Sequence, residues 1–150
     1  MEERYGTKEY YYNTKPQMDQ APRKPQDQDS EKRKIFDIRE RTLEFSLRVI
    51  DIAEALPKSL LSEIVRRQLM KSGTSIGANV QEADGSVSKK DFINKASIAR
   101  KEARETKYWL RILDRKNENI DLSDEIQEVQ EIIKILSAMI TNTKNSDKAK

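Results

Sequence analysis

The chain has 150 residues, of which 29 are Lys or Arg and 26 are Asp or Glu, so its formal net charge is only +3. Because it contains neither Cys nor His, its residues cannot form disulfides, Cys- or His-ligated metal sites or a Ser-His-Asp triad. Apolar runs are only a few residues long and none follows the N-terminal Met, so we expect a cytoplasmic protein with no membrane span, signal peptide, metal or cofactor.

The first 34 residues differ in composition from the rest. Residues 1–34 contain no Leu, Ile, Val or Phe, whereas residues 35–150 carry all 33 of them. Burial cannot offset the ordering entropy of such a segment, and we predict a disordered polar tail. Its tyrosines, Tyr10, Tyr11 and Tyr12, fit either a stacking arm for single-stranded nucleic acid or, as we favour, a disordered leader without specific contacts.

Two amphipathic helices are predicted in the first half of the remaining chain. Apolar residues recur at helical spacing over residues 35–56, and Pro57 ends that helix. The second helix is expected over residues 59–84, where the apolar stripe includes Gly73 and Gly77. Each glycine costs roughly 1 kcal/mol in a helix interior. We interpret the pair as a point of close approach by another helix, or as a kink.

Two further helices complete the predicted domain, which spans residues 35–142. The third runs from Ser86 or Ser88 to residue 116, and the fourth begins with Asp121 or Ser123 as its N-cap. Residues 143–150 are left as a short basic C-terminal tail. Since the connections are short and no strand pattern persists, the predicted fold class is all-α, an antiparallel up-down-up-down four-helix bundle with a disordered N-terminal tail.

Positive charge gathers on the third helix. Residues 66–116 carry 13 basic and 6 acidic groups, a net charge of +7, whereas residues 117–140 carry 1 and 6, a net charge of −5. One flank of the third helix forms a basic stripe of Arg100, Arg104, Lys107, Arg111 and Arg115. Five cations along roughly 22 Å of helix could contact nucleic-acid phosphates. The alternative, favoured by the pattern alone, is a solvated face or one that is ion-paired with Glu82 or the fourth helix.

The opposite flank of the third helix combines apolar and acidic residues. This mixed flank comprises Ile98, Glu102, Glu105, Trp109 and Ile112. Trp is enriched at interfaces, and unpaired acids do not enter a core, so we interpret the mixed flank as an oligomer interface rather than a widening of the core.

A polar stripe follows one side of the second helix. It comprises Gln68, Ser72, Ser75, Asn79 and Glu82. We interpret it, and Ser75, Asn79 and Glu82 in particular, as a hydrogen-bond network between helices rather than as a ligand or RNA site. No catalytic constellation accompanies it.

The sequence of these two helices resembles a known family. The segment Ser72-Gly73-Thr74-Ser75-Ile76-Gly77-Ala78-Asn79-Val80-Gln81-Glu82-Ala83 is similar to the motif S-x-x-S-I-x-A-N-I-x-E-G/A, and the similarity continues through Phe92 and from Ile98 to Leu110. Together they resemble the small four helix bundle protein family over about residues 35–140. Some members are encoded in intervening sequences of large-subunit ribosomal RNA genes, and relatives serve as accessory variability determinants of diversity-generating retroelements.

The resemblance implies a ring-like homopentamer of antiparallel four-helix bundles without enzymatic activity. In the retroelement relatives, a positive ring surface binds nucleic acid and a reverse transcriptase. The positions that match the family motif are Ser75, Asn79, Glu82, Arg100, Glu102, Arg104, Glu105 and Trp109. We therefore expect a non-catalytic homo-oligomeric adaptor, with RNA or DNA and, for the retroelement type, a reverse transcriptase as partners. The alternative is a structural self-assembly or protein-interaction module that binds no nucleic acid.

Overall fold

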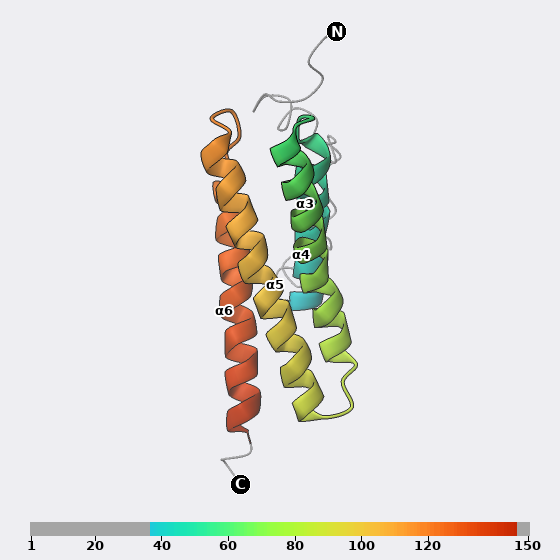
Figure 1. Cartoon of the computed structure of the whole chain (residues 1–150). Coiled ribbons are helices and arrows are strands. Elements are labelled where there is room, and N and C mark those ends of the chain that lie inside the picture. Colours follow the sequence, from blue (N-terminus) through green and yellow to red (C-terminus); the bar gives the residue numbers. More distant parts are fainter. Residues whose placement is uncertain (1–36, 147–150) are drawn as a thin grey trace, which may run out of the picture.

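The computed structural model describes residues 37–146, so the predicted disordered tail over residues 1–34 lies outside it. Four α-helices follow one another and are labelled as in Figure 1: α3 (Ile38–Ala55), α4 (Leu60–Asp84), α5 (Lys89–Lys116) and α6 (Ser123–Asn145). No strand occurs over residues 37–146. The predicted all-α class is confirmed.

Successive helices run in opposite directions and pack as neighbours, in the predicted up-down-up-down order (Figure 1). α4 packs against both α3 and α5, and α5 packs against α6, whereas α3 and α6 share a much smaller contact. α3 has 18 residues and α5 has 28, which makes α3 about 15 Å shorter. The side of the bundle between α3 and α6 is therefore the least closely packed.

Side-chain caps set where three of the helices begin. Asp37, Ser59 and Ser88 have extended backbones, and their side chains accept hydrogen bonds from backbone N–H groups in the first turns of α3, α4 and α5. Two of these caps, Ser59 and Ser88, are at the boundaries that the sequence predicts. The short polar side chains of these residues supply acceptors that the first turn of a helix otherwise lacks.

The start of α6 differs from the prediction. The N-cap is Leu122, with no side-chain cap, rather than Asp121 or Ser123. Asp121 acts from one position further out, where its carboxylate accepts hydrogen bonds from the backbone N–H and the hydroxyl of Ser123 over 3.1 and 2.6 Å. α6 also continues to Asn145, three residues beyond the predicted end of the domain at residue 142.

The core is built from the apolar stripes of all four helices. Ala96, Ala99 and Ala103 supply small side chains on α5, which allow its neighbours to approach closely. The largest fully buried apolar side chains are Phe45, Val49, Val65, Leu69, Ile76, Leu110, Leu113, Leu122, Val129, Ile132 and Leu136.

Gly73 and Gly77 mark a close approach between α3 and α4. A Cβ atom at Gly73 would lie 2.5 Å from Cγ1 of Val49, and one at Gly77 would lie 3.3 Å from Oγ of Ser46. The hydroxyl of Ser46 also donates a hydrogen bond to the carbonyl of Gly73 over 3.2 Å. Close approach is thus confirmed as the reason for a glycine pair within a helix.

Candidate nucleic-acid interface

The basic stripe lies along the boundary between α5 and α6. Arg100 donates a hydrogen bond to the hydroxyl of Ser137 over 3.4 Å, and Lys107 donates to the side-chain carbonyl of Gln130. Both cations are half-buried, whereas the remaining members of the stripe, Arg104, Arg111 and Arg115, are exposed. The partners that α6 offers to the stripe are therefore neutral.

Glu128 and Glu82, two acids that could neutralise the basic stripe, have other partners. Glu128 of α6 accepts two hydrogen bonds from Arg41 of α3, over 2.7 and 2.9 Å, and lies 4.0 Å from Arg48. Glu82 of α4 pairs with Lys95. Over residues 37–146, no ion pair joins any member of the basic stripe to a carboxylate. The predicted alternative of pairing with Glu82 or with the fourth helix is therefore not found within one chain.

These ion pairs shift the pKa values of their members in the expected directions. Hydrogen bonds from Arg41 hold the pKa of Glu128 below its ordinary value, although partial burial of this carboxylate acts in the opposite sense. The hydrogen bond to Glu82 raises the pKa of Lys95. Glu128 is therefore ionised at neutral pH, and Arg41 holds its carboxylate at the contact between α3 and α6.

The side of α6 that lies next to the basic stripe contributes no negative charge that could neutralise the stripe. Gln130, Lys134 and Ser137 follow one another at spacings of four and three residues, which places them on one side of α6. Lys134 pairs with Glu131 over 2.8 Å. The face formed by α5 and α6 therefore keeps the positive charge of the stripe.

The mixed flank lies on the α4 side of α5. Its position follows from Lys95, which precedes Ile98 by one turn and pairs with Glu82 of α4. Trp109 is half-buried and packs against the core, and its Nε1 donates a hydrogen bond to Glu105 over 3.4 Å. The other members, Ile98, Glu102 and Ile112, are also half-buried.

The structure brings only part of the polar stripe together. Asn79 donates a hydrogen bond to the backbone carbonyl of Ser75 over 2.8 Å, and Glu82 accepts one from Lys95 of α5. Ser72, also a member of the stripe, takes part in a second, buried hydrogen bond between α4 and α5, in which the hydroxyl of Thr106 donates to that of Ser72 over 2.9 Å. The predicted network between helices is therefore formed in part, through Ser72 and Glu82, and the polar stripe itself does not indicate Thr106 as a partner.

Exposed apolar side chains at the start of α4 form a feature that sequence reasoning missed. Leu60, Leu61 and Ile64 are 78%, 43% and 49% exposed. Leu61 and Ile64 extend the line of the polar stripe, since residues 61, 64 and 68 are separated by three and four positions. That line places them on the same side of α4 as the mixed flank of α5. On α3, Leu43 and Leu47 are also about half exposed, at 47% and 48%.

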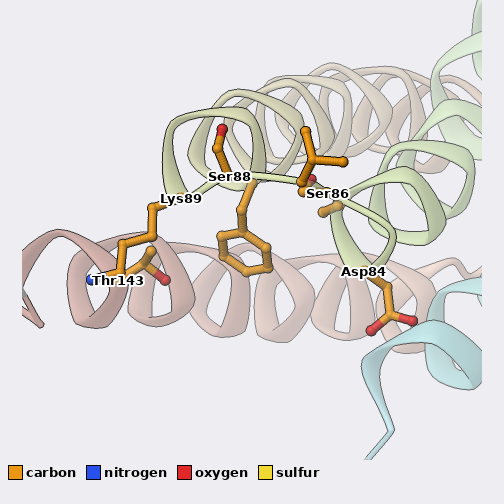
Figure 2. Close-up of a pocket in the computed structure, with 8 residues that line it drawn as sticks. Asp84, Ser86, Ser88, Lys89 and Thr143 are labelled. Carbon is orange, nitrogen blue, oxygen red and sulfur yellow. The ribbon is translucent and has the colours of Figure 1, made fainter.

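A pocket of about 440 Å³ lies at the connection between α4 and α5 (Figure 2). Its polar side chains already have structural roles: Ser88 caps α5, Asp84 pairs with Arg39, and Ser86 donates a hydrogen bond to a backbone carbonyl of α4. Figure 2 shows Lys89 reaching from α5 toward α6, where its Nζ donates to the hydroxyl of Ser146 over 2.9 Å. These groups therefore hold the connection between α4 and α5 in place.

Neither a metal site nor a membrane span emerges from the described part of the chain. No group of carboxylates within residues 37–146 could hold a metal ion. None of the helices α3 to α6 has a stretch that is apolar enough to cross a bilayer. The basic stripe and the mixed flank remain the two surfaces with a distinctive composition.

Comparison with known proteins agrees with this architecture. The profile of the 23S rRNA-intervening sequence protein family matches residues 34–142. The chain belongs to that family. Among solved structures, it is similar to a protein with unknown function from the S23 ribosomal protein family of Bacteroides thetaiotaomicron. The identity is 37% and the TM-score 0.62, over 69% of this chain and 97% of that chain. No curated protein matches the chain.

The family assignment confirms the resemblance seen in the sequence. The matched region begins and ends close to the predicted domain boundaries and contains the whole basic stripe and the whole mixed flank. Both surfaces thus lie within the part of the chain that matches the family.

Proposed function

We propose that this 23S rRNA-intervening sequence protein is a non-catalytic, homo-oligomeric adaptor of the cytoplasm that binds nucleic acid through its basic stripe. The observation that carries the proposal is that, within residues 37–146, no carboxylate pairs with the five cations of the stripe. The stripe follows the α5–α6 boundary at steps of three or four residues, about 4.5–6 Å each. Such a row of cations can bind phosphates and release their counterions.

RNA is the nucleic acid that we favour. The names of the family and of the relative from the S23 ribosomal protein family both refer to the ribosome. Long cations on a helix face reach backbone oxygens more readily than base edges, so binding should show little sequence preference. If this protein is of the retroelement accessory type, the same positive surface would also meet a reverse transcriptase.

Assembly of several copies is the second part of the proposal. Trp109 on α5 and the exposed Leu61 and Ile64 on α4 lie on the same side of the bundle, and such apolar surface is typical of protein interfaces. Glu102 and Glu105 share that side and would border the contact. A closed ring, with five copies as the family resemblance implies, would repeat the basic stripe around its circumference.

Charge reversal on the stripe tests the proposal. Arg104 and Arg111 are exposed and make no hydrogen bond or ion pair over residues 37–146, so Arg104→Glu/Arg111→Glu should fold and assemble normally. Five phosphate contacts would give a slope of log K against log salt of about −3.5 to −4.5, and the double variant should flatten it by about 1.4–1.8. Gel shifts with a structured RNA at two salt concentrations measure both affinity and slope.

A matched variant controls for net charge. Lys58→Glu/Lys71→Glu changes the charge equally at two exposed positions outside the stripe, and its RNA affinity should stay close to that of the unmodified protein. If the stripe variant keeps the affinity and slope of the unmodified protein, the stripe is a solvated surface and the proposal is wrong. Loss of assembly by the stripe variant before RNA is added would instead indicate pairing of these cations with acids of another subunit.

A structural self-assembly or protein-interaction module is the second candidate function. The observation that favours it is the exposed apolar surface of α3 and α4, where Leu43 and Leu47 of α3 and Leu61 and Ile64 of α4 are each more than two-fifths exposed. This candidate predicts assembly without any salt-dependent binding of RNA. Light scattering that gives the monomer mass of 17.5 kDa at micromolar concentration would contradict both candidates.

A further inference from the structure

An exposed aromatic ring borders the basic stripe. Tyr108 of α5 is 59% exposed, whereas the other aromatic residues within residues 37–146, Phe45, Phe92 and Trp109, are buried or half-buried. Tyr108 follows Arg104 by four residues and precedes Arg111 by three, so the three side chains leave the same side of the helix. Tyr108 thus lies between the exposed Arg104 and Arg111 along the helix, at the edge of the stripe.

The orientation of this ring is restrained by its neighbour. The rings of Tyr108 and Trp109 meet edge to face, with centroids 5.3 Å apart and an angle of 70° between their planes. Trp109 in turn packs against the core. A ring that is held in place loses little conformational entropy when a ligand binds to it.

We propose that the basic stripe takes a single-stranded stretch of RNA, with one base stacked on Tyr108 and the flanking phosphates on Arg104 and Arg111. This inference rests on the proposed function and narrows it to one substrate class. Arg104 and Arg111 are seven residues apart, about 10 Å along the helix. That separation leaves room for a base on the ring between two phosphate contacts.

The physical chemistry of the site favours a single strand over a duplex. Proteins that bind single strands combine a cationic track for the backbone with aromatic side chains on which bases stack. In a duplex the faces of the bases are covered by their neighbours, and a ring beside the phosphates has nothing to stack on. Glu102 and Glu105 on the other flank of α5 also confine favourable phosphate contacts to one side of the helix.

Two substitutions at Tyr108 test the inference. Tyr108→Ala removes the ring, whereas Tyr108→Phe keeps it and serves as the matched control. Affinity should be measured by fluorescence anisotropy for an unstructured 12-nucleotide RNA and for the duplex that this RNA forms with its complement. Tyr108→Ala should weaken binding of the single strand by about 5- to 140-fold. Tyr108→Phe should bind it like the unmodified protein.

Two further readouts separate stacking from charge and from structure. The slope of log K against log salt should not change in Tyr108→Ala, because no phosphate contact is lost. Duplex affinity should also stay unchanged. Trp109 is the single tryptophan of the chain and touches Tyr108, so its emission should change when the single strand binds to the unmodified protein.

The possible failures are distinguishable. If the unmodified protein shows no salt-dependent binding to either RNA, the proposed function is wrong and the inference falls with it. If Arg104→Glu/Arg111→Glu weakens binding while Tyr108→Ala does not, the stripe binds phosphates and only the stacking role is overturned. A fall in assembled mass in Tyr108→Ala would assign the ring to a contact between copies of this chain, and would likewise overturn the inference.

Discussion

Replacing Gly73 by Ala should destabilise the bundle, although alanine is the better helix former. A helix gains about 1 kcal/mol when an interior glycine becomes alanine. The new Cβ atom, however, would lie 2.5 Å from Cγ1 of Val49 and 3.1 Å from both its Cβ and its Cγ2. Rotation about χ1 of Val49 cannot move its Cβ, and β-branched residues in helices are stiff at χ1. The helices α3 and α4 must therefore separate.

The expected magnitude follows from these opposing effects. Overpacking of this kind costs typically 1–3 kcal/mol, so Gly73→Ala should lower the free energy of unfolding by up to about 2 kcal/mol after the gain in helix propensity. The same substitution in a Val49→Ala background should instead raise stability by up to about 1 kcal/mol, because the 2.5 Å contact with Cγ1 and the 3.1 Å contact with Cγ2 are gone and only the 3.1 Å contact with Cβ remains. The difference between the two backgrounds, about 1–3 kcal/mol, isolates the steric contact.

Urea unfolding followed by circular dichroism at one fixed protein concentration measures all four proteins of this cycle. The fixed concentration matters because assembly would couple stability to it. Gly85→Ala is the control, since a Cβ atom there would meet nothing closer than 3.8 Å. An equal effect of Gly73→Ala in both backgrounds, or a gain in stability in the unmodified background, would show that contact with Val49 is not what requires glycine at this position.

Three more predictions follow from the mixed flank, from the hydrogen bonds of Arg66 and from the ion pair of Glu128. Trp109→Ala should lower the assembled mass seen by light scattering, because it should weaken association by on the order of 2 kcal/mol per interface. A lower melting temperature with an unchanged assembled mass would show instead that Trp109 stabilises only the core of one chain. Arg66→Met should cost about 1–3 kcal/mol in urea unfolding, because the guanidinium donates two 2.8 Å hydrogen bonds to carbonyls at the end of α3. Arg41 lowers the pKa of Glu128 in the folded protein. The stabilisation that Glu128 provides is therefore complete above the pKa of this residue in the unfolded chain, and it is lost as the pH falls through its lower pKa in the folded protein. Glu128→Gln should therefore lose less stability than the unmodified protein between neutral and acidic pH, and equal losses would contradict this assignment.

Much of the fold could be predicted from local sequence. Ser59 and Ser88 cap the helices that the apolar spacing indicated, because capping depends on a side chain and a backbone N–H only two or three residues apart. The start of α6 could not be predicted in the same way. Its first turn depends partly on Asp114 of α5, whose carboxylate accepts a hydrogen bond from the N–H of Leu122 over 2.9 Å, and contacts between helices leave no local pattern.

The candidate site shows the same division. The sequence by itself determined that Arg100, Arg104, Lys107, Arg111 and Arg115 share one side of a helix, since helical spacing is a property of the backbone. It could not determine whether acids face them. Only the tertiary structure decided that Glu128 turns toward α3, that Glu82 meets Lys95, and that α6 presents neutral Gln130 and Ser137 to the stripe. The rotation of each helix about its own axis is fixed by the packing of all four apolar stripes together, and that packing decided which charges are paired and which remain free to bind.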